Sequence, residues 1–390
     1  MKINFPHFIS LIVILSLPAS VTDATEAIDA PSKPEKPLAD RVLAHDYPSI
    51  ARPWGLCVDF SNEERHRDIV KHDISWESIG RGRDGLGDRA IGANWAGNYR
   101  ALGTNFANLN DCLERRRTLL ASNPNAVVLA ELRWRDYTDS SLPENHDFWK
   151  RDPSGNRIVA KGDKMNEPRY YLDNDNPHLV KHLLIEAKYI VESGAYDGVF
   201  LDWFGPSATF LKQLRETIGS RYLIIVNANY KYDPERAQYI NGAYLECYKT
   251  NNPASLEQWE HTVQSPKVNV LDMMGEPTGC TGSPDLQRMR NTTTYSLVHS
   301  DGYVLYGDHF HKHRWFPFWD AKLGKPLSDG VQISKDSYRR EFEKGFAINN
   351  SNEDSVTVTL PRLVKRLSDG SSGTMFTIHG NDGDIFLKAE

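Results

Sequence analysis

Carboxylates and amides close several apolar runs in this chain, and acid/base chemistry uses side chains of this kind. The polar residues at the ends of these runs are Asp59, Glu131, Arg133, Asp202, Asn227, Asn229, Glu246, Asp272, Asp308 and His309. Gathered in one cleft, such groups can move protons on neutral, hydroxyl-rich molecules without a metal ion. Two carboxylates at a suitable separation could cleave a glycosidic bond.

Asp202 is the strongest candidate among these residues. In YDGVFLDWFG (196–205) it follows an apolar run, whereas Asp197 precedes the run beside Gly198, where an Asp-Gly turn is a sufficient explanation. Asp202 lies about 16 Å further along an extended strand. It shares the parity of Gly198 and Phe200, so it would cap a barrel interior if those residues face inward. We predict a functional carboxylate, the alternative being a salt-bridged barrel residue.

Glu246 is the predicted catalytic partner of Asp202. It closes NGAYLECY (241–248) two strands later, and Tyr248 shares its parity, so Tyr248 could belong to a sugar-binding wall. The alternative for Glu246 is a carboxylate bonded to loop amides. Further candidates for substrate contacts are Glu131, Arg133, Trp134, Trp203, Asn227, Asn229, Asp272 and His309, of which Trp134 and Trp203, with Tyr248, could stack on sugar rings.

Metal binding is not indicated, and we expect no cofactor. HFHKHRW (309–315) has three histidines at alternate positions, but no matching set of ligands is visible, so substrate contacts or loop packing are favoured. Asp173 and Asp175 lack the remainder of a calcium-loop pattern, and turn chemistry ahead of a helix explains them.

From residue 53 the chain alternates short apolar runs with polar, helix-like segments. Eight strands are predicted, at 54–60, 73–78, 125–134, 197–204, 222–230, 241–248, 267–274 and 301–308. Their continuous apolarity indicates parallel strands covered on both faces, and eight β/α units indicate a closed α/β structure, the (β/α)₈ TIM barrel. A doubly wound open sheet is the alternative, but no G-x-G-x-x-G fingerprint follows the first strand.

Changes in composition and in hydrophobic pattern along the chain indicate its domain organisation. Residues 1–24 have the layout of a signal peptide, and the proline-rich segment 25–50 is interpreted as a linker or N-terminal arm. The barrel is predicted over 51–335. Residues 336–390 alternate with period two and contain an Asn-Asp-Gly hairpin signal, which predicts a small C-terminal antiparallel β domain. The protein is expected to be secreted or periplasmic.

Charge and cysteine content narrow the functional classes. Lysine and arginine total 46 against 52 aspartates and glutamates, so nothing suggests a nucleic-acid partner. No later stretch is long and apolar enough to predict membrane insertion. Four cysteines allow three full pairings, and a Cys247–Cys280 bridge is favoured because both would lie in neighbouring loops, whereas Cys57 could be a buried thiol.

At YDGVFLDWFG, INGAYLECY and YRREFEKGFAINN the chain resembles the hypothetical glycosyl-hydrolase family fifteen, whose barrel relatives include the endo-α-1,4-polygalactosaminidases. The likeness runs from about residue 53 to the C-terminal sheet. It implies a glycosidase barrel acting on a poly- or oligosaccharide. Carried over by motif, the family's catalytic carboxylates fall on Asp202 and Glu246.

The mechanism expected from these residues is double displacement. Asp202 would attack the anomeric carbon, while Glu246 would protonate the leaving oxygen and later activate water. This requires carboxyl groups about 5 Å apart, whereas a gap of about 7–9 Å would favour inversion. A non-catalytic polysaccharide-binding barrel is the main alternative, and a serine hydrolase is disfavoured because no G-x-S-x-G motif is present.

Overall fold

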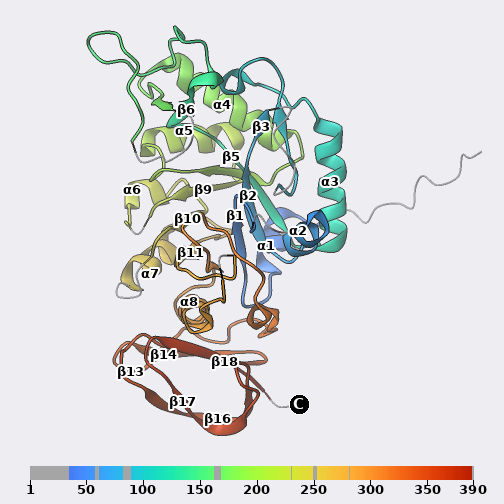
Figure 1. The fold of residues 1–390 in the computed structure, drawn as a ribbon, viewed down its shortest axis with the longest axis vertical. Coiled ribbons are helices and arrows are strands. Elements are labelled where there is room, and N and C mark those ends of the chain that lie inside the picture. Colours follow the sequence, from blue (N-terminus) through green and yellow to red (C-terminus); the bar gives the residue numbers. More distant parts are fainter. Residues whose placement is uncertain are drawn as a thin grey trace, which may run out of the picture. The chain divides into compact units, whose positions relative to one another are not determined.

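The computed structural model describes residues 35–57, 61–81, 89–161, 168–229, 231–248, 253–280 and 282–388. The predicted signal peptide at 1–24 and Asp59 lie outside these residues. Within them, a barrel is followed by an antiparallel sheet near the C-terminus (Figure 1).

The described residues contain an eight-stranded sheet in which neighbouring strands run parallel. Its strands in spatial order are β1 (Ala51–Pro53), β2 (Ile74–Ser78), β5 (Val127–Glu131), β8 (Gly198–Leu201), β9 (Leu223–Asn227), β10 (Gly242–Leu245), β11 (Val270–Asp272) and β12 (Tyr303–Leu305). A parallel bridge between Ile50 and Val304 joins the two edges. The sheet therefore closes, and the predicted (β/α)₈ barrel is confirmed.

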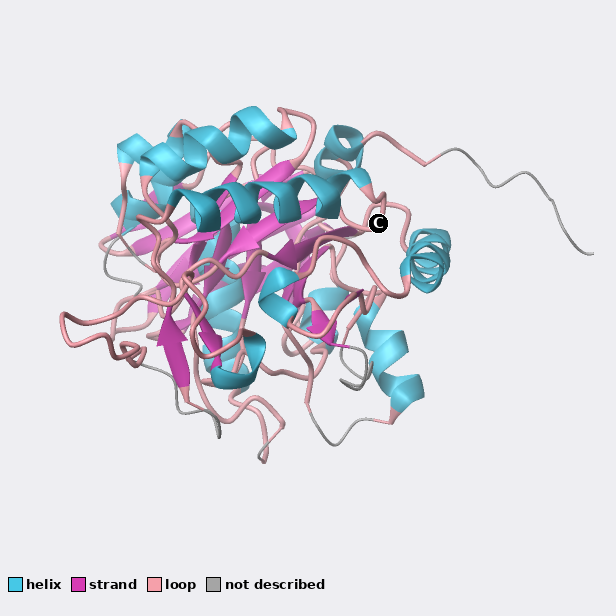
Figure 2. Ribbon diagram, turned by 90° about the horizontal axis from the view of Figure 1, so that it is seen from above, coloured by secondary structure: helices cyan, strands magenta, loops and turns pink. Residues whose placement is uncertain are grey.

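Helices cover the outside of the barrel strands (Figure 2). They are α2 (Asn62–Ile69), α3 (Leu109–Ser122), α4 (Pro177–Glu192), α5 (Ala208–Ile218), α6 (Pro234–Ala237), α7 (Pro253–Thr262) and α8 (Leu286–His299), with short 3₁₀ turns at Arg100–Leu102, Asp139–Ser141 and Pro317–Asp320. By contrast, α1 (Leu38–Leu43) packs its Val42 against inward-facing residues of the strands. The start of α4 follows the predicted signal, because Asn176 caps the helix and Pro177 occupies its first position.

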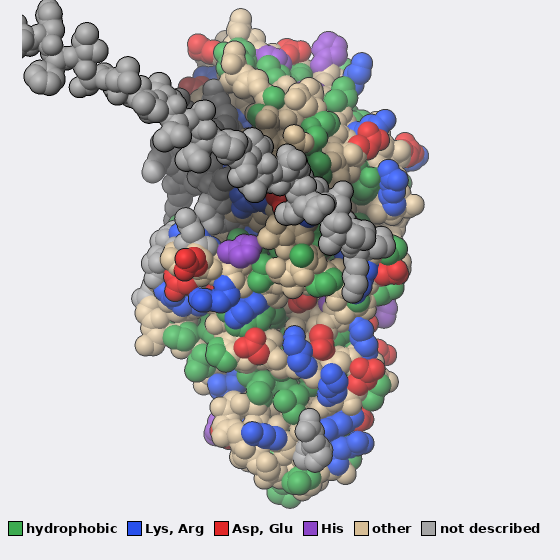
Figure 3. All heavy atoms as spheres, turned by 90° about the vertical axis from the view of Figure 1, so that its right-hand side faces the viewer, with side chains coloured by type: hydrophobic (Ala, Val, Ile, Leu, Met, Phe, Trp, Pro, Cys, Tyr) green, Lys and Arg blue, Asp and Glu red, His purple; other side chains and the backbone are tan. Residues whose placement is uncertain are grey.

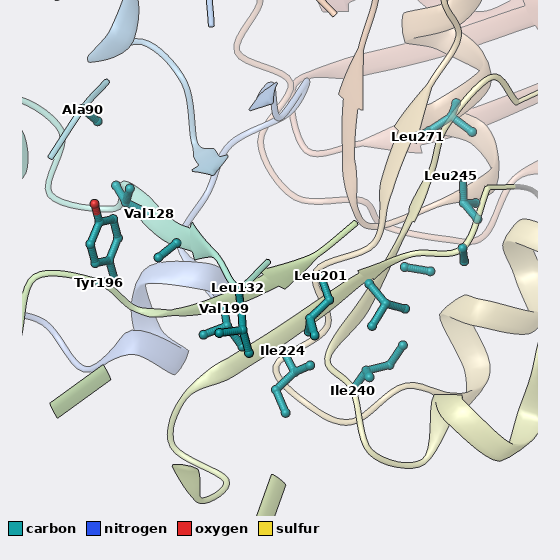
Figure 4. Close-up of a cluster of buried hydrophobic side chains, with 14 of the residues drawn as sticks. Ala90, Val128, Leu132, Tyr196, Val199, Leu201, Ile224, Ile240, Leu245 and Leu271 are labelled. Atoms are coloured by element: carbon teal, nitrogen blue, oxygen red, sulfur yellow. The ribbon is translucent and has the colours of Figure 1, made fainter. Parts of the chain in front are cut away.

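Alternate side chains of the barrel strands enter two different cores. Outward-facing residues such as Val128, Val199 and Ile224 pack beneath the helices (Figure 4). Inward-facing residues form a second cluster that includes Trp76, Phe200 and fully buried aliphatic side chains. This alternation places Phe200 inside the barrel, as the parity of its strand predicted.

The first strand lies earlier than predicted. β1 covers Ala51–Pro53 rather than 54–60, and it pairs with Ile74–Trp76 of β2. The strand ends because Trp54 adopts a left-handed φ of 46° and Gly55 turns back to bond the carbonyl of Pro53. The apolar residues at 54–57 therefore belong to the loop above the barrel.

Two small sheets lie in connecting segments. β3 (Gly80–Arg81) pairs with β4 (Asn94–Trp95), and β6 (Asp136–Thr138) pairs with β7 (Arg169–Tyr171). The second sheet lies inside the long insertion at 135–175. It gives that insertion an ordered framework next to the carboxyl ends of the strands.

The C-terminal region forms a six-stranded antiparallel sheet in the described residues. Its strands are β13 (Val331–Ser334), β14 (Ser337–Phe342), β15 (Gly345–Asn350), β16 (Val356–Arg366), β17 (Ser372–Ile378) and β18 (Asp382–Lys388). The order β13-β14-β15-β18-β16-β17 shows that the hairpin predicted at Asn381-Asp382-Gly383 is wrong. A turn is present, with Asn381 at a φ of 53°, but β18 inserts between β15 and β16 instead of pairing with β17.

Helix α8 joins the barrel to this sheet, and it contacts β14, β15 and β18 (Figure 1). The junction is hydrogen-bonded: the Asn349 side-chain amide donates to Asn291 and to Thr294 Oγ1, and Arg290 forms an ion pair of 2.7 Å with Asp382. Asn291 and Thr294 of α8 therefore have partners although they are buried.

The disulfide joins Cys57 to Cys280, so the predicted Cys247–Cys280 pairing is wrong. Their Cα atoms lie 5.5 Å apart. Cys57 lies in the loop after β1 and Cys280 in the loop after β11, and these two strands flank β12 in the closed barrel. The Cys247 sulfur instead lies 4.0 Å from the sulfur of Met274. Closure of the barrel thus brought together two loops that are far apart in the sequence.

On the face shown in Figure 3, basic and acidic side chains are intermixed. Among the described residues, no helix has the length and apolarity needed to span a bilayer.

Candidate active site

An aromatic layer closes the barrel interior beneath the carboxyl ends of the strands. Trp76 stacks on Phe200 at a centroid distance of 4.4 Å, and Tyr244 meets Trp76 edge-on. Trp54 lies on this layer, 5.5 Å from Phe200. Because the rings fill the barrel, any ligand must bind above them.

A cavity of about 560 Å³ lies above this layer. Its lining comprises Trp54, Ser78, Glu131, Arg133, Arg169, Asp202, Trp203, Phe204, Asn227, Glu246, His309, Phe310, His311 and Lys312. Seven of the predicted site residues are present: Glu131, Arg133, Asp202, Trp203, Asn227, Glu246 and His309. They meet because the carboxyl ends of all the barrel strands lie at the same end of the barrel.

Asp202 and Glu246 share one amide group. Asn227 Nδ2 donates to Asp202 Oδ1 at 2.8 Å and to Glu246 Oε2 at 2.6 Å. Asn227 ends β9, which lies between β8 and β10 in the barrel, so its side chain is well placed to reach both neighbours. Two oxygens bound to the same nitrogen at these distances are at most about 5.4 Å apart, and this limit is compatible with the separation of about 5–5.5 Å typical of retaining glycosidases.

The environment of Asp202 makes ionisation costly. Burial and the nearby charges of Glu131 and Glu246 raise the pKa of Asp202 to about 6, although the hydrogen bond from Asn227 acts in the opposite direction. The backbone behind Asp202 is also constrained. Trp203 and Phe204 both adopt left-handed φ angles, 60° and 63°, which are costly outside glycine. Such a turn fixes the direction of the carboxylate.

Glu246 is held by an imidazole as well as by Asn227. His311 Nε2 lies 3.1 Å from Glu246 Oε1, and His311 Nδ1 lies 2.7 Å from Asp272 Oδ2. Burial alone would raise the pKa of Glu246, but His311 and Asn227 hold it below its ordinary value. Asp272 is fully buried and also accepts a hydrogen bond from the hydroxyl of Tyr244.

An ion-pair cluster forms the opposite wall of the cavity. Glu131 accepts hydrogen bonds from Trp54 Nε1 at 3.1 Å and from Arg133 at 2.9 Å, and it also accepts from the hydroxyl of Ser78. Arg133 continues to the buried Asp136 at 2.8 Å. Burial opposes ionisation of Glu131, but Arg133 and Ser78 bring its pKa below the ordinary value. Glu131 is therefore a charged, immobilised group that holds Trp54 and Arg133 in place.

Tyr248 does not belong to the cavity wall, so this prediction is wrong. β10 ends at Leu245, and Cys247 adopts a left-handed φ of 55°, which breaks the two-residue parity after Glu246. Tyr248 is consequently buried against Tyr295, at a ring distance of 5.9 Å.

Three further predicted contact residues lie outside the cavity lining. Trp134 faces a separate cavity of about 790 Å³ beside α4 and α5, and its indole nitrogen donates to the carbonyl of Asp202. Asn229 reaches the site only through its backbone, which donates to Asn227 Oδ1. Asp272 lies behind His311. Each of these residues supports a cavity residue instead of facing a ligand.

Sequence reasoning missed several lining residues. The loop after β8 contributes Phe204, and the loop after β12 contributes Phe310, His311 and Lys312. Phe204 and Phe310 are 54% and 62% exposed, which is unusual for phenylalanine and suits a stacking surface. The three alternating histidines do not share a face. His311 adopts a left-handed φ of 62°, and the resulting turn directs each ring to a different neighbour.

No group of three or more histidine, cysteine, aspartate or glutamate side chains in the described chain is arranged to hold a metal ion. Asp173 and Asp175 lie at the turn before α4.

No family model matches the chain, and no curated protein matches it either. Solved structures with the same fold include a noncanonic maltogenic α-amylase from Thermotoga neapolitana (12% identity, TM-score 0.56, covering 89% of this chain and 100% of that chain). A cyclic α-maltosyl-(1→6)-maltose hydrolase from Arthrobacter globiformis (11%, 0.56, 90% and 100%) and an α-amylase from Lactobacillus plantarum (10%, 0.53, 90% and 100%) are also similar.

At such low identity these likenesses show the fold: an amylase-like (β/α)₈ barrel with a C-terminal antiparallel sheet. The neighbours are amylase-type glycoside hydrolases. The finer resemblance, to the hypothetical family fifteen and the polygalactosaminidases, is not confirmed by these comparisons.

Proposed function

We propose that the chain is a glycoside hydrolase that cleaves poly- or oligosaccharides with Asp202 and Glu246. The observation that carries this proposal is the single amide of Asn227 bonded to both carboxylates. Because both carboxylates bind one nitrogen, their nearest oxygens are at most about 5.4 Å apart, which supports retaining cleavage. The names of the structural neighbours, which are amylases and a cyclic α-maltosyl-(1→6)-maltose hydrolase, support the same reaction class.

The proposed reaction has two displacements. Asp202 attacks the anomeric carbon, the bond to the leaving oxygen breaks, and Glu246 gives that oxygen a proton. Water then loses a proton to Glu246 and attacks the same carbon, which releases Asp202 from the glycosyl ester. The overall configuration is retained, and both carboxyl groups return to their initial state.

The lining of the cavity suits a sugar chain. The exposed rings of Phe204 and Phe310 offer apolar faces at the rim, and Trp203 is held by Arg135, whose guanidinium carbon lies 3.7 Å from the centre of the indole. Arg133, which lines the cavity, supplies donors for sugar hydroxyl groups. Substrate recognition would thus combine stacking with a small number of fixed polar contacts.

A non-catalytic polysaccharide-binding barrel is the alternative function. It would use the same aromatic rim but would have no need for two carboxylates held together above the barrel. Burying them side by side costs free energy through desolvation and like-charge repulsion. The close pair therefore favours the enzyme.

We further propose that the protein is exported. The signal-like layout of residues 1–24 suggests this, and the Cys57–Cys280 disulfide supports an oxidising compartment.

The test compares wild type, Asp202→Asn and the exposed control Asp175→Asn on starch, pullulan, dextran, chitosan and an α-1,4-linked galactosaminan. We expect wild type and the control to cleave one of these glycans, and Asp202→Asn to lose at least about 10³-fold in rate. Proton NMR of the first product should show the anomeric configuration of the substrate. Equal cleavage by Asp202→Asn would refute the nucleophile, and binding without cleavage by wild type would favour the alternative function.

A further inference from the structure

His311 lies between two carboxylates inside the site. Its Nε2 faces Glu246 Oε1 at 3.1 Å and its Nδ1 faces Asp272 Oδ2 at 2.7 Å. An ionised carboxylate only accepts hydrogen bonds, so both ring nitrogens must carry hydrogen when both acids are ionised. If His311 is neutral, one of the two acids must carry the proton instead. The Asp272–His311–Glu246 row, called the relay here, therefore holds one mobile proton.

The backbone fixes the ring of His311 in this row. Asp308 Oδ1 accepts from the backbone nitrogens of Phe310 and Lys312 at 2.8 and 2.9 Å, and the His311 nitrogen donates to the carbonyl of Asp308. A side chain at Gly307 would meet the backbone of His311 at about 3 Å, so the turn can close only with glycine there. The left-handed φ of His311 follows from this tight turn.

We propose that His311 is a positioning residue that stores the proton Glu246 delivers to the leaving oxygen. This inference rests on the proposed function and assigns the source of its acid. The proton moves from His311 Nε2 to Glu246 Oε1, which leaves a neutral imidazole and a neutral carboxyl group. Glu246 then gives that proton to the glycosidic oxygen as the bond to the sugar breaks. In the second step the proton taken from water returns through Glu246 to Nε2.

The surroundings of His311 support storage of a proton. Burial disfavours the charged ring, but the hydrogen bonds and charges of Asp272 and Glu246 raise the pKa of His311 to about 10. The Tyr244 hydroxyl lies 2.9 Å from Nδ1, and Trp54 covers the ring at a centroid distance of 5.2 Å. His313 also faces this segment.

The relay explains how Glu246 can act as an acid although its pKa is low. Glu246 has a lowered pKa, which would suit a base better than an acid. The protonated ring of His311 lowers the pKa of Glu246. The same ring proton can pass to Glu246 over a single hydrogen bond. Asp272, which is fully buried, keeps the other side of the ring occupied and directs Nε2 toward Glu246.

The first test needs no substrate. In ¹⁵N NMR of the full chain, the His311 imidazole should keep its second proton to about pH 10 and should lose it at least one unit lower in Glu246→Gln, because the partner charge is then gone. Titration of His311 near its ordinary value in wild type would overturn the proposal while leaving the hydrolase intact.

The second test uses 4-nitrophenyl and 2,4-dinitrophenyl glycosides of the sugar that wild type releases. His311→Gln should lose about 10²-fold on the natural glycan and much less on the dinitrophenyl glycoside, whose leaving group needs no proton. The alkaline limb of kcat/KM should move down from near pH 10, and Asp272→Asn should move it in the same direction. His178→Gln, on the exposed start of α4, is the matched control. An equal loss of rate on the natural glycan and on the dinitrophenyl glycoside, with the alkaline limb of kcat/KM unchanged, would show a merely structural role.

Discussion

The shared amide of Asn227 offers the sharpest test of the site. Asn227→Leu keeps a similar volume but removes both donors, to Asp202 at 2.8 Å and to Glu246 at 2.6 Å. A hydrogen bond to a charged group contributes about 1.5–3 kcal/mol, so its loss should raise the pKa of Asp202 by about one to two units. Since the starting pKa is about 6, the acidic limb of kcat/KM should move above pH 7.

The sign of the effect follows from the role of Asp202. A nucleophile must be ionised, and activity is lost as pH falls through its pKa. A pKa raised from about 6 to about 7.5 would reduce the ionised fraction at pH 7 about fourfold, whereas at pH 9 nearly all Asp202 would be ionised in both proteins. The ratio of variant to wild-type kcat/KM should therefore rise from pH 6 to pH 9.

The assay is a pH series of initial rates on the glycan that wild type cleaves. Asn227→Asp, which adds a third acid of the same shape, should move the limb further. Asn229→Gly is the matched control, because it keeps the backbone donor to position 227 and tolerates the left-handed φ of 52° at that position. A deficit that is the same at every pH would refute the proposed coupling of the amide to the ionisation of Asp202.

Three predictions concern the framework that holds the site. Gly198→Ala should destabilise the fold by about 1–3 kcal/mol in urea unfolding, because its Cβ would meet the backbone of β9 at 2.1 Å, whereas Gly373→Ala, with 3.6 Å to its nearest neighbour, should have little effect. Cys57→Ser should lower the free energy of unfolding by about 2–5 kcal/mol and lower the melting temperature, whereas Cys247→Ser should change neither. Equal melting temperatures of the two variants would contradict a stabilising role of the disulfide. Asp197→Ala should cost about 3–5 kcal/mol by circular dichroism melting, since two buried arginines lose this carboxylate, and a fully stable variant would exclude that burial cost.

Much of the fold was predictable because parallel barrel strands are covered on both faces. The runs containing Val199 and Ile224 are apolar without alternation, and each ends at a polar residue that lines the cavity. The same rule selects Asp202 and Glu246 from the sequence, and both line the cavity. It required only local sequence and the common direction of the strands.

The remaining features depend on geometry that local sequence does not contain. The left-handed turn at Cys247 reverses the expected side of Tyr248, and the turn at His311 separates three histidines that share a parity. Pairing of Cys57 with Cys280 requires closure of the barrel around β12. The position of β18 between β15 and β16, in contact with α8, likewise involves partners that are far away in the sequence.

Helix α8 has a consequence for how this protein can evolve and be engineered. Its Asn291 and Thr294 accept hydrogen bonds from Asn349 of β15, so the helix and the sheet are joined by specific polar contacts and not by an apolar face alone. Gly383 approaches the helix so closely that a side chain there would collide with Thr294 at 1.9 Å. If the barrel were produced without the sheet, the amide and hydroxyl side chains on this face of α8 would lose their partners and become exposed to water. Shuffling the sheet between barrels would therefore demand that the helix be exchanged along with it.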